Sequence, residues 1–279
     1  MAAILSTNMA SLYAQKNLST AQASLSDSVQ RLSSGTRINS AKDDAAGYGI
    51  AESVRGTKNI VDQNIRNAKD GISWAQTAEG ALDVVGKILQ RALTLTTQGL
   101  DATLNVDQRK SIGTELVALS DEISNIKERT KFQGGTSAFS VFDVSGNIIK
   151  VDTGSGTGKE TSIEAKMVSL TAIDTFAATL KNTGTAATTS TNVTAVETAI
   201  ATNATNRGTL GAAINSLEYA VDNMQTLSTN LADGISRIVD TDYAAETSNL
   251  TRTQILQQAA TSMLAQANQM PNVILTLLK

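Results

Sequence analysis

The last segment of the chain, residues 253–278, carries no charged side chain, although it has the periodicity of a long helix. Its apolar residues follow a four-three alternation, the spacing of a helix that packs lengthwise against another helix. The remaining positions are mostly amides and hydroxyls, which are too polar for a membrane span and too uncharged for an ordinary solvated face. We therefore expect other protein to enclose this helix, because charges would be costly to bury there. The apolar positions are Leu256, Ala260, Met263, Ala267, Met270, Ile274 and Leu277.

The first segment, about residues 2–34, has the same character. Up to residue 30 it carries only two charges, Lys16 and Asp27. Because both ends of the chain are low-charge amphipathic helices, the simplest expectation is that they pack on each other as a coiled coil. The predicted assembly positions in this segment are Leu5, Leu12, Leu18, Leu25 and Leu32, with a slip in phase between Leu12 and Leu18.

The composition limits the chemistry that the chain can perform. It holds no cysteine and no histidine, so it offers no disulfide, thiolate nucleophile, imidazole base, or histidine or cysteine metal ligand. A net charge of −3 leaves no basic footprint for nucleic acid. No stretch reaches the ~20 apolar residues of a membrane helix. We expect no enzyme activity, cofactor, metal, nucleic-acid partner or membrane insertion.

The beginning of the chain lacks the basic and long apolar regions of a cleaved signal peptide. Taken alone, that absence indicates the cytoplasm. A single proline permits long uninterrupted helices, and an aromatic content of 3% favours narrow helix-on-helix seams over a thick core.

Three further helical patterns follow the first segment. Gly35 reads as a helix stop, and Ser40 with Asp43 as a restart. The pattern that follows runs to about Gly99, another covers residues 112–126, and a fourth covers residues 210–238. Residues 132–191 hold turn formers around short β-branched runs, which predicts a small β-hairpin region. Residues 181–207 are Thr-rich with weak periodicity and read as an exposed loop followed by frayed helix.

Several short motifs have weak functional readings. Residues 153–160 resemble a phosphate-binding loop, but Thr153 stands where that loop needs glycine, and Glu160 where it needs a hydroxyl. The adjacent carboxylates Asp43 and Asp44 fit a helix start better than a metal site. Asn192 and Asn203 each begin a glycosylation-type triplet, which is a short and weak pattern.

Two longer motifs carry a family resemblance. Residues 31–47, Arg-Leu-Ser-Ser-Gly-Thr-Arg-Ile-Asn-Ser-Ala-Lys-Asp-Asp-Ala-Ala-Gly, resemble the N-terminal signature of bacterial flagellins. Residues 259–278, with Ala-Gln-Ala-Asn-Gln-Met-Pro at 265–271, resemble their C-terminal signature, as do residues 242–244 and 254–258. The resemblance covers about residues 1–135 and 192–279, in the order that the family has.

This resemblance implies a self-assembling filament subunit that is exported unfolded through the flagellar type III apparatus, which would overturn the cytoplasmic indication. It implies an extracellular location, with an export chaperone and cap or junction proteins as partners beside the homopolymer. The fold expected is mainly α, an elongated helical rod with paired N- and C-terminal coiled-coil helices and a small β-hairpin region. The expected divisions are an inner-core domain from 1–40 and 241–279, a rod domain from 41–135 and 192–240, and a short variable region at 136–191.

The resemblance also implies a surface that Toll-like receptor 5 recognises, or that packs between protofilaments. The family pattern is Leu-Gln-Arg-x-Arg-Glu-Leu with a glutamate on the next helix. The chain departs from it at Leu93 and Thr94, where the pattern has Arg-Glu. The matching residues are Leu89, Gln90, Arg91, Leu95 and Glu115.

Two other readings remain open from the sequence. A hook–filament junction protein shares similar helical ends but forms only a short ring. A cytoplasmic coiled-coil scaffold would be expected to carry charges beside the seams of its terminal helices, and this chain does not.

Overall fold

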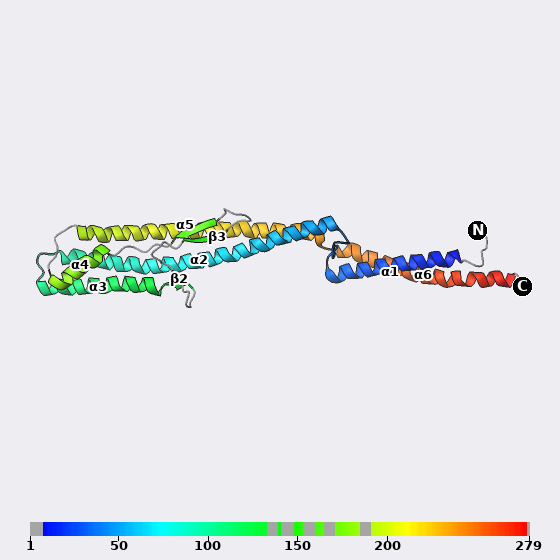
Figure 1. Ribbon diagram of the computed structural model, residues 1–279, viewed down its shortest axis with the longest axis horizontal. Coiled ribbons are helices and arrows are strands. Elements are labelled where there is room, and N and C mark those ends of the chain that lie inside the picture. Colours follow the sequence, from blue (N-terminus) through cyan, green and yellow to red (C-terminus); the bar gives the residue numbers. More distant parts are fainter. Residues whose placement is uncertain are drawn as a thin grey trace. The chain divides into compact units, whose positions relative to one another are not determined.

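The computed structural model describes residues 8–132, 139–140, 148–152, 160–164, 171–184 and 191–277 (Figure 1). The fold is mainly helical, as predicted. No helix in these ranges is long and apolar enough to cross a membrane. The helices are α1 (Met9–Ser34), α2 (Ala45–Gly99), α3 (Val106–Arg129), α4 (Thr171–Thr183), α5 (Thr191–Val239) and α6 (Tyr243–Leu277).

The chain divides into two compact units. Unit 1 comprises Met1–Lys58 and Thr229–Lys279, and unit 2 comprises Asn59–Ser228. Unit 1 holds α1 and α6 with the adjoining ends of α2 and α5. Unit 2 holds the rest of α2 and α5 together with α3, α4 and four short strands.

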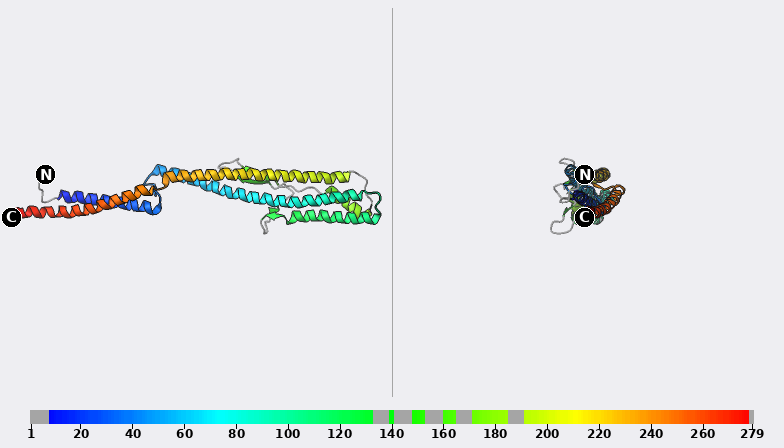
Figure 2. Two further views of the ribbon diagram at one scale, coloured as in Figure 1. Left: turned by 180° about the vertical axis from the view of Figure 1, so that it is seen from behind. Right: turned by 90° about the vertical axis from the view of Figure 1, so that its right-hand side faces the viewer.

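In unit 1, α1 and α6 lie side by side and run antiparallel (Figures 1 and 2). Asn8 Nδ2 donates to the Ala267 carbonyl over 2.8 Å near one end of the pair, and Arg31 lies 3.8 Å from Glu246 near the other. The helix stop predicted at Gly35 is confirmed. This residue has a φ of 72°, which glycine adopts without strain, and its N–H donates to the Arg31 carbonyl.

The connection between α1 and α2 differs in detail from the prediction. The Asp43 carboxylate accepts hydrogen bonds from the backbone of Asn39 and Ser40, which closes a turn before the helix. The helix itself begins two residues later, at Ala45, with the N–H of Gly47 donating to Asp44 Oδ1 over 2.9 Å. Asp44 therefore provides the cap that the sequence suggested for Ser40 and Asp43.

Unit 2 is built on an antiparallel contact between α2 and α5. Arg207 of α5 binds Glu79 of α2, and further along Ser228 of α5 donates to Asp62 of α2 over 2.6 Å. At the end of α2, helices α3 and α4 complete a core of aliphatic side chains. Its members are Val85, Leu89, Ala92, Leu95, Ile112, Leu116, Ile123, Ile173, Ala177, Leu180, Val196 and Ala199.

Four short strands lie between α3 and α4 in the sequence. β1 (Lys131–Phe132) pairs antiparallel with β2 (Phe139–Ser140). β3 (Ile148–Asp152) pairs antiparallel with β4 (Glu160–Glu164), with Ile148 opposite Glu164 and Asp152 opposite Glu160. The phosphate-loop-like residues 153–159 lie outside the described residues.

Two parts of the middle region are helical where the sequence analysis expected otherwise. Residues 171–183 form α4 inside the predicted hairpin region, and α5 begins at Thr191 inside the segment read as loop and frayed helix. The sequence analysis did not predict α4 because the threonines in this segment have low helix propensity. The helix is stabilised by burying Ile173, Ala177 and Leu180 against α3.

Candidate assembly interface

The α1 side of the α1–α6 contact is a regular heptad seam. Its buried positions, Ala14, Ala21 and Ser28, recur every seven residues and are all small. Half-buried leucines alternate with them at positions 18, 25 and 32. Small side chains at every second seam position let the two helix axes approach closely. Leu18, Leu25 and Leu32 are therefore placed between the two helices of one chain.

The α6 side of the contact overlaps the predicted stripe only in part, at Ala260 and Ala267. The residues turned towards α1 are Glu246, Leu250, Thr253, Gln257, Ala260, Leu264 and Ala267. Leu256 and Met263 are 52% and 63% exposed. These two residues are therefore not buried against α1, and their place in an assembly interface stays a prediction. The side of α6 that carries Ala260 and Ala267 lies against the small residues of α1.

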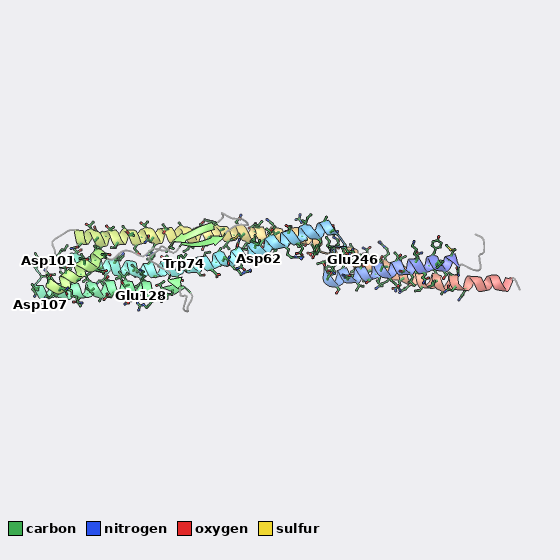
Figure 3. All side chains as sticks on the ribbon, in the orientation of Figure 1. Asp62, Trp74, Asp101, Asp107, Glu128 and Glu246 are labelled. Atoms are coloured by element: carbon green, nitrogen blue, oxygen red, sulfur yellow. The ribbon has the colours of Figure 1, made fainter. Side chains whose placement is uncertain are left out.

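A groove lined by residues of both helices runs along the pair. It has a volume of about 990 Å³, and α1 contributes Met9 and Tyr13 while α6 contributes Leu256 and Met263. These four side chains are between 49% and 63% exposed. None of the groove's lining residues is charged. Figure 3 shows the side chains that project from both helices along this contact.

Other predicted assembly residues fall in several places. Leu12 is 51% exposed on α1. Leu5 lies outside the described residues. Met270, Ile274 and Leu277 belong to the backbone of α6, but their side chains lie outside the described part of the structure. The helix continues through Pro271 to Leu277, so this proline does not end it.

Polar contacts hold the two helices in one alignment. Ser11 donates to Asn268 Oδ1 over 2.9 Å beside the Asn8 contact. At the opposite end, Glu246 is only 7% exposed and lies next to Arg31.

In the turn between α1 and α2, the backbone N–H groups of Ser40 and Asn39 hold the pKa of the Asp43 carboxyl below its ordinary value of 3.8.

The predicted receptor or protofilament surface is divided by the structure. Arg91 of α2 and Glu115 of α3 are exposed and form an ion pair, with Nη2 and Nε lying 2.7 Å and 2.9 Å from Oε1. Gln90 beside them is also exposed. Leu89 and Leu95 are 0% and 2% exposed and belong to the core of unit 2. These two leucines therefore do not form part of a surface.

The burial of Asn203 excludes one of the two glycosylation-type triplets as a modification site. Asn203, which begins a glycosylation-type triplet, is 3% exposed and donates to the Leu82 carbonyl over 3.1 Å. A glycan cannot be attached to an asparagine that is enclosed in this way. The signal that could have revealed its burial is its heptad spacing from Leu210 and Leu217.

Comparison with known proteins agrees with the two signature motifs. The family model for the bacterial flagellin N-terminal helical region matches residues 5–137, and that for the C-terminal helical region matches residues 193–278. A flagellin of Halalkalibacterium halodurans is 37% identical over 277 residues, which cover 99% of this chain and 100% of that protein. The chain belongs to the bacterial flagellin family.

Further similarities extend over the whole chain or over part of it. Polar flagellin F of Vibrio parahaemolyticus is 31% identical over 377 residues, covering 100% of both chains. The crystal structure of Bacillus cereus flagellin aligns with a TM-score of 0.45 at 27% identity, covering 61% of this chain and 94% of that one. As a flagellin, the protein is a structural component of the flagellar filament outside the cell, and it is not an enzyme.

Proposed function

We propose that this flagellin polymerises through the groove along α1 and α6, which receives the same helices of neighbouring subunits. The observation that carries the proposal is a long apolar groove without a charge among its lining residues. Burying a large apolar side chain contributes about 1.5–3 kcal/mol. The four exposed residues Met9, Tyr13, Leu256 and Met263 thus offer substantial association energy that the single chain leaves unused.

The absence of charges matters as much as the apolar area. A neighbouring copy brings the same uncharged helices, so both partners can be desolvated without stranding a charge. Leu12 is a further exposed candidate for such contacts. Leu18, Leu25 and Leu32 would act indirectly, because they hold α1 against α6 and so keep the groove in shape. Leu5, Met270, Ile274 and Leu277 would extend the interface towards the chain ends.

A charge placed in the groove tests this proposal. Met263→Glu should prevent filament growth, because burying an uncompensated carboxylate costs several kcal/mol per subunit contact. The matched control is Thr261→Glu, which adds the same charge to an exposed residue of α6 that does not line the groove. Electron microscopy and sedimentation after seeding with short filament fragments measure the result. Normal filaments from Met263→Glu would contradict the role of the groove.

The product of the same experiment separates the filament from its alternative. Long tubes built from this chain alone are expected of a filament subunit. Short rings that stop growing would instead support a hook–filament junction protein. Removing residues 272–279 should also abolish filaments while leaving unit 2 folded, because none of these residues belongs to unit 2.

Export and the wider assembly belong to the same proposal. The subunit is proposed to leave the cell unfolded through the flagellar type III apparatus, with an export chaperone before secretion and cap and junction proteins at the filament ends. The lack of cysteine suits this route, since no disulfide could form before threading. The proposed functional divisions are an inner core of residues 1–40 and 241–279, a rod of 41–135 and 192–240, and a variable region of 136–191.

A second surface is proposed around the Arg91–Glu115 ion pair. Together with Gln90 it offers an exposed, oriented guanidinium, either to a neighbouring protofilament or, on the free subunit, to Toll-like receptor 5. Arg91→Ala should lower signalling in a reporter-cell assay. Arg66→Ala is the control, because Arg66 is an exposed arginine of the same helix that binds only Gln63 among the contacts that the structure gives it. Equal responses from both variants would remove the receptor from the proposal.

A further inference from the structure

Helices α2 and α5 of unit 2 each carry a buried position that repeats every seven residues. On α5 one seam position recurs as Val196, Asn203, Leu210, Leu217 and Met224, all of them buried. On α2 the corresponding position recurs as Val61, Ala68, Ala75, Leu82, Leu89 and Thr96, all of them buried. A slide of one helix by seven residues would therefore again bring apolar side chains against apolar side chains. The hydrophobic pattern alone does not choose between these alignments.

Asn203 is the polar exception in the α5 seam. Its Nδ2 donates to the carbonyl of Leu82, but its Oδ1 is buried and accepts no hydrogen bond from the described residues. A buried amide with one unpaired oxygen costs free energy that a leucine of similar size would not. Stability therefore does not explain why an asparagine stands at this position.

The place where Asn203 binds is shaped for it. The amide of Asn203 passes close to Gly86 to contact the Leu82 carbonyl. A Cβ added to Gly86 would lie 3.0 Å from Asn203 Nδ2. A slide of seven residues would bring Leu93 or Glu79 to the place of Gly86. Both residues carry a Cβ that would crowd the Asn203 amide at this place, which would weaken the hydrogen bond that its Nδ2 donates in the described structure.

Arg207, one turn further along α5, also favours the native alignment of α5 on α2 over a slide of seven residues. Its Nη2 and Nε bind Glu79 Oε1 over 2.6 Å and 3.0 Å, and its Nη1 lies 3.0 Å from Asp83 Oδ1. These two carboxylates raise the pKa of Arg207, with the hydrogen bond to Glu79 as the largest cause. A slide of seven residues would offer it Gly86 and Gln90 in one direction, or Ile72 and Gln76 in the other. Neither alternative supplies a carboxylate.

We infer that Asn203 and Arg207 determine the register of α5 on α2, acting as alignment residues rather than as sources of stability. The Gly86 opening and the pair of carboxylates exist together in one register only. A polar residue that specifies the alignment of a heptad seam at some cost in stability is the best-attested use of buried polar groups.

The chain holds no cysteine, so engineered disulfides report the register without background. Asp62 and Ser228 touch across the two helices, with 2.6 Å between Ser228 Oγ and Asp62 Oδ1, so D62C/S228C reports the native alignment. R55C/S228C and K69C/S228C report slides of seven residues in either direction. Each pair is placed in the otherwise unchanged protein and in a protein carrying N203L and R207M. The fraction of disulfide formed under mild oxidation is measured by mobility on a gel.

In the otherwise unchanged protein, we expect the native disulfide to form readily and each shifted disulfide to form only in trace amounts. N203L/R207M should raise the fraction of at least one shifted disulfide tenfold or more, with no loss in melting temperature. The matched control is N215L/R237M, which changes an exposed asparagine of α5 and an arginine whose ion pair among the described residues, with Asp233, lies within α5. If the shifted disulfides stay at the level of this control while the native disulfide forms, the inference is overturned.

A second measurement holds even if N203L/R207M folds poorly. Gly86→Ala should lower the melting temperature of the unchanged protein, because its Cβ crowds Asn203. The same substitution in an N203A background should raise the melting temperature, since alanine favours a helix over glycine. A change of the same sign in both backgrounds would show that Asn203 does not act through the opening at Gly86.

Discussion

Gly113 of α3 lies directly against the backbone of Leu180 in α4. A Cβ added to Gly113 would be only 2.7 Å from the Leu180 carbonyl carbon. Further along the two helices, the Ser120 hydroxyl donates a hydrogen bond to the Asp174 carboxylate. Backbone contact of this kind leaves no room for a side chain. The position of α4 therefore depends on a glycine that the helical pattern of α3 would otherwise disfavour.

Gly113→Ala is expected to destabilise unit 2 by about 1–3 kcal/mol, because the added methyl group must push α4 away from α3. Thermal unfolding followed by circular dichroism measures the loss. Gly80→Ala is the matched control, since a Cβ there meets nothing within 4 Å. It should be stabilising by roughly 0.5–1 kcal/mol. Equal melting temperatures for the two variants would contradict the close approach.

Leu89→Ala tests the reassignment of this residue from a surface to the core. Removing a fully buried leucine is expected to cost about 2–5 kcal/mol of unfolding free energy. The neighbouring Gln90→Ala is its control and should change stability by less than about 0.5 kcal/mol, because Gln90 is exposed. Denaturant unfolding of both variants gives the comparison. A loss below 1 kcal/mol for Leu89→Ala would place this side chain outside the core.

Glu115→Gln separates stability from recognition at the Arg91 surface. Exposed ion pairs contribute only about 0.2–1 kcal/mol, and both side chains are about half exposed. We expect a shift in melting temperature near the limit of detection, together with a clear change in reporter-cell signalling if the surface is recognised. A large loss of stability would mean that the pair is structural.

The carboxylate of Asp43 should make part of the stability of unit 1 sensitive to acid. Its pKa in the folded chain lies below the ordinary 3.8, so the folded state favours the charged form. This stabilisation is present above pH 3.8 and is lost as the pH falls through the lower folded value. Asp43→Asn should therefore weaken the dependence of melting temperature on pH below about 4.

Ser40→Ala is the control for Asp43→Asn. It removes the hydroxyl that donates to Asp43 but keeps both backbone N–H donors, which are the larger causes of the lowered pKa. Its acid dependence should stay close to that of the unchanged protein. If Asp43→Asn shows the same pH dependence as Ser40→Ala, the turn before α2 does not contribute to acid sensitivity.

Much of the architecture could be predicted from local signals. The stop at Gly35 followed from the demand for a left-handed residue after a helix, and the end of α2 at Gly99 from the loss of periodicity. The beginning of α5 could not be predicted, because the Thr-rich residues after Thr191 have weak intrinsic helix propensity and depend on packing against α2.

The candidate interface was predicted in kind but not residue by residue. The sequence by itself determined that the terminal helices are long, carry few charges and each have an apolar seam. Only the tertiary structure decided that Ala260 and Ala267 of this seam in α6 face α1, whereas Met263 remains open. The reason is geometric: periodicity shows that a stripe is apolar, but the fit against the small residues Ala14 and Ala21 selects the stripe that is buried.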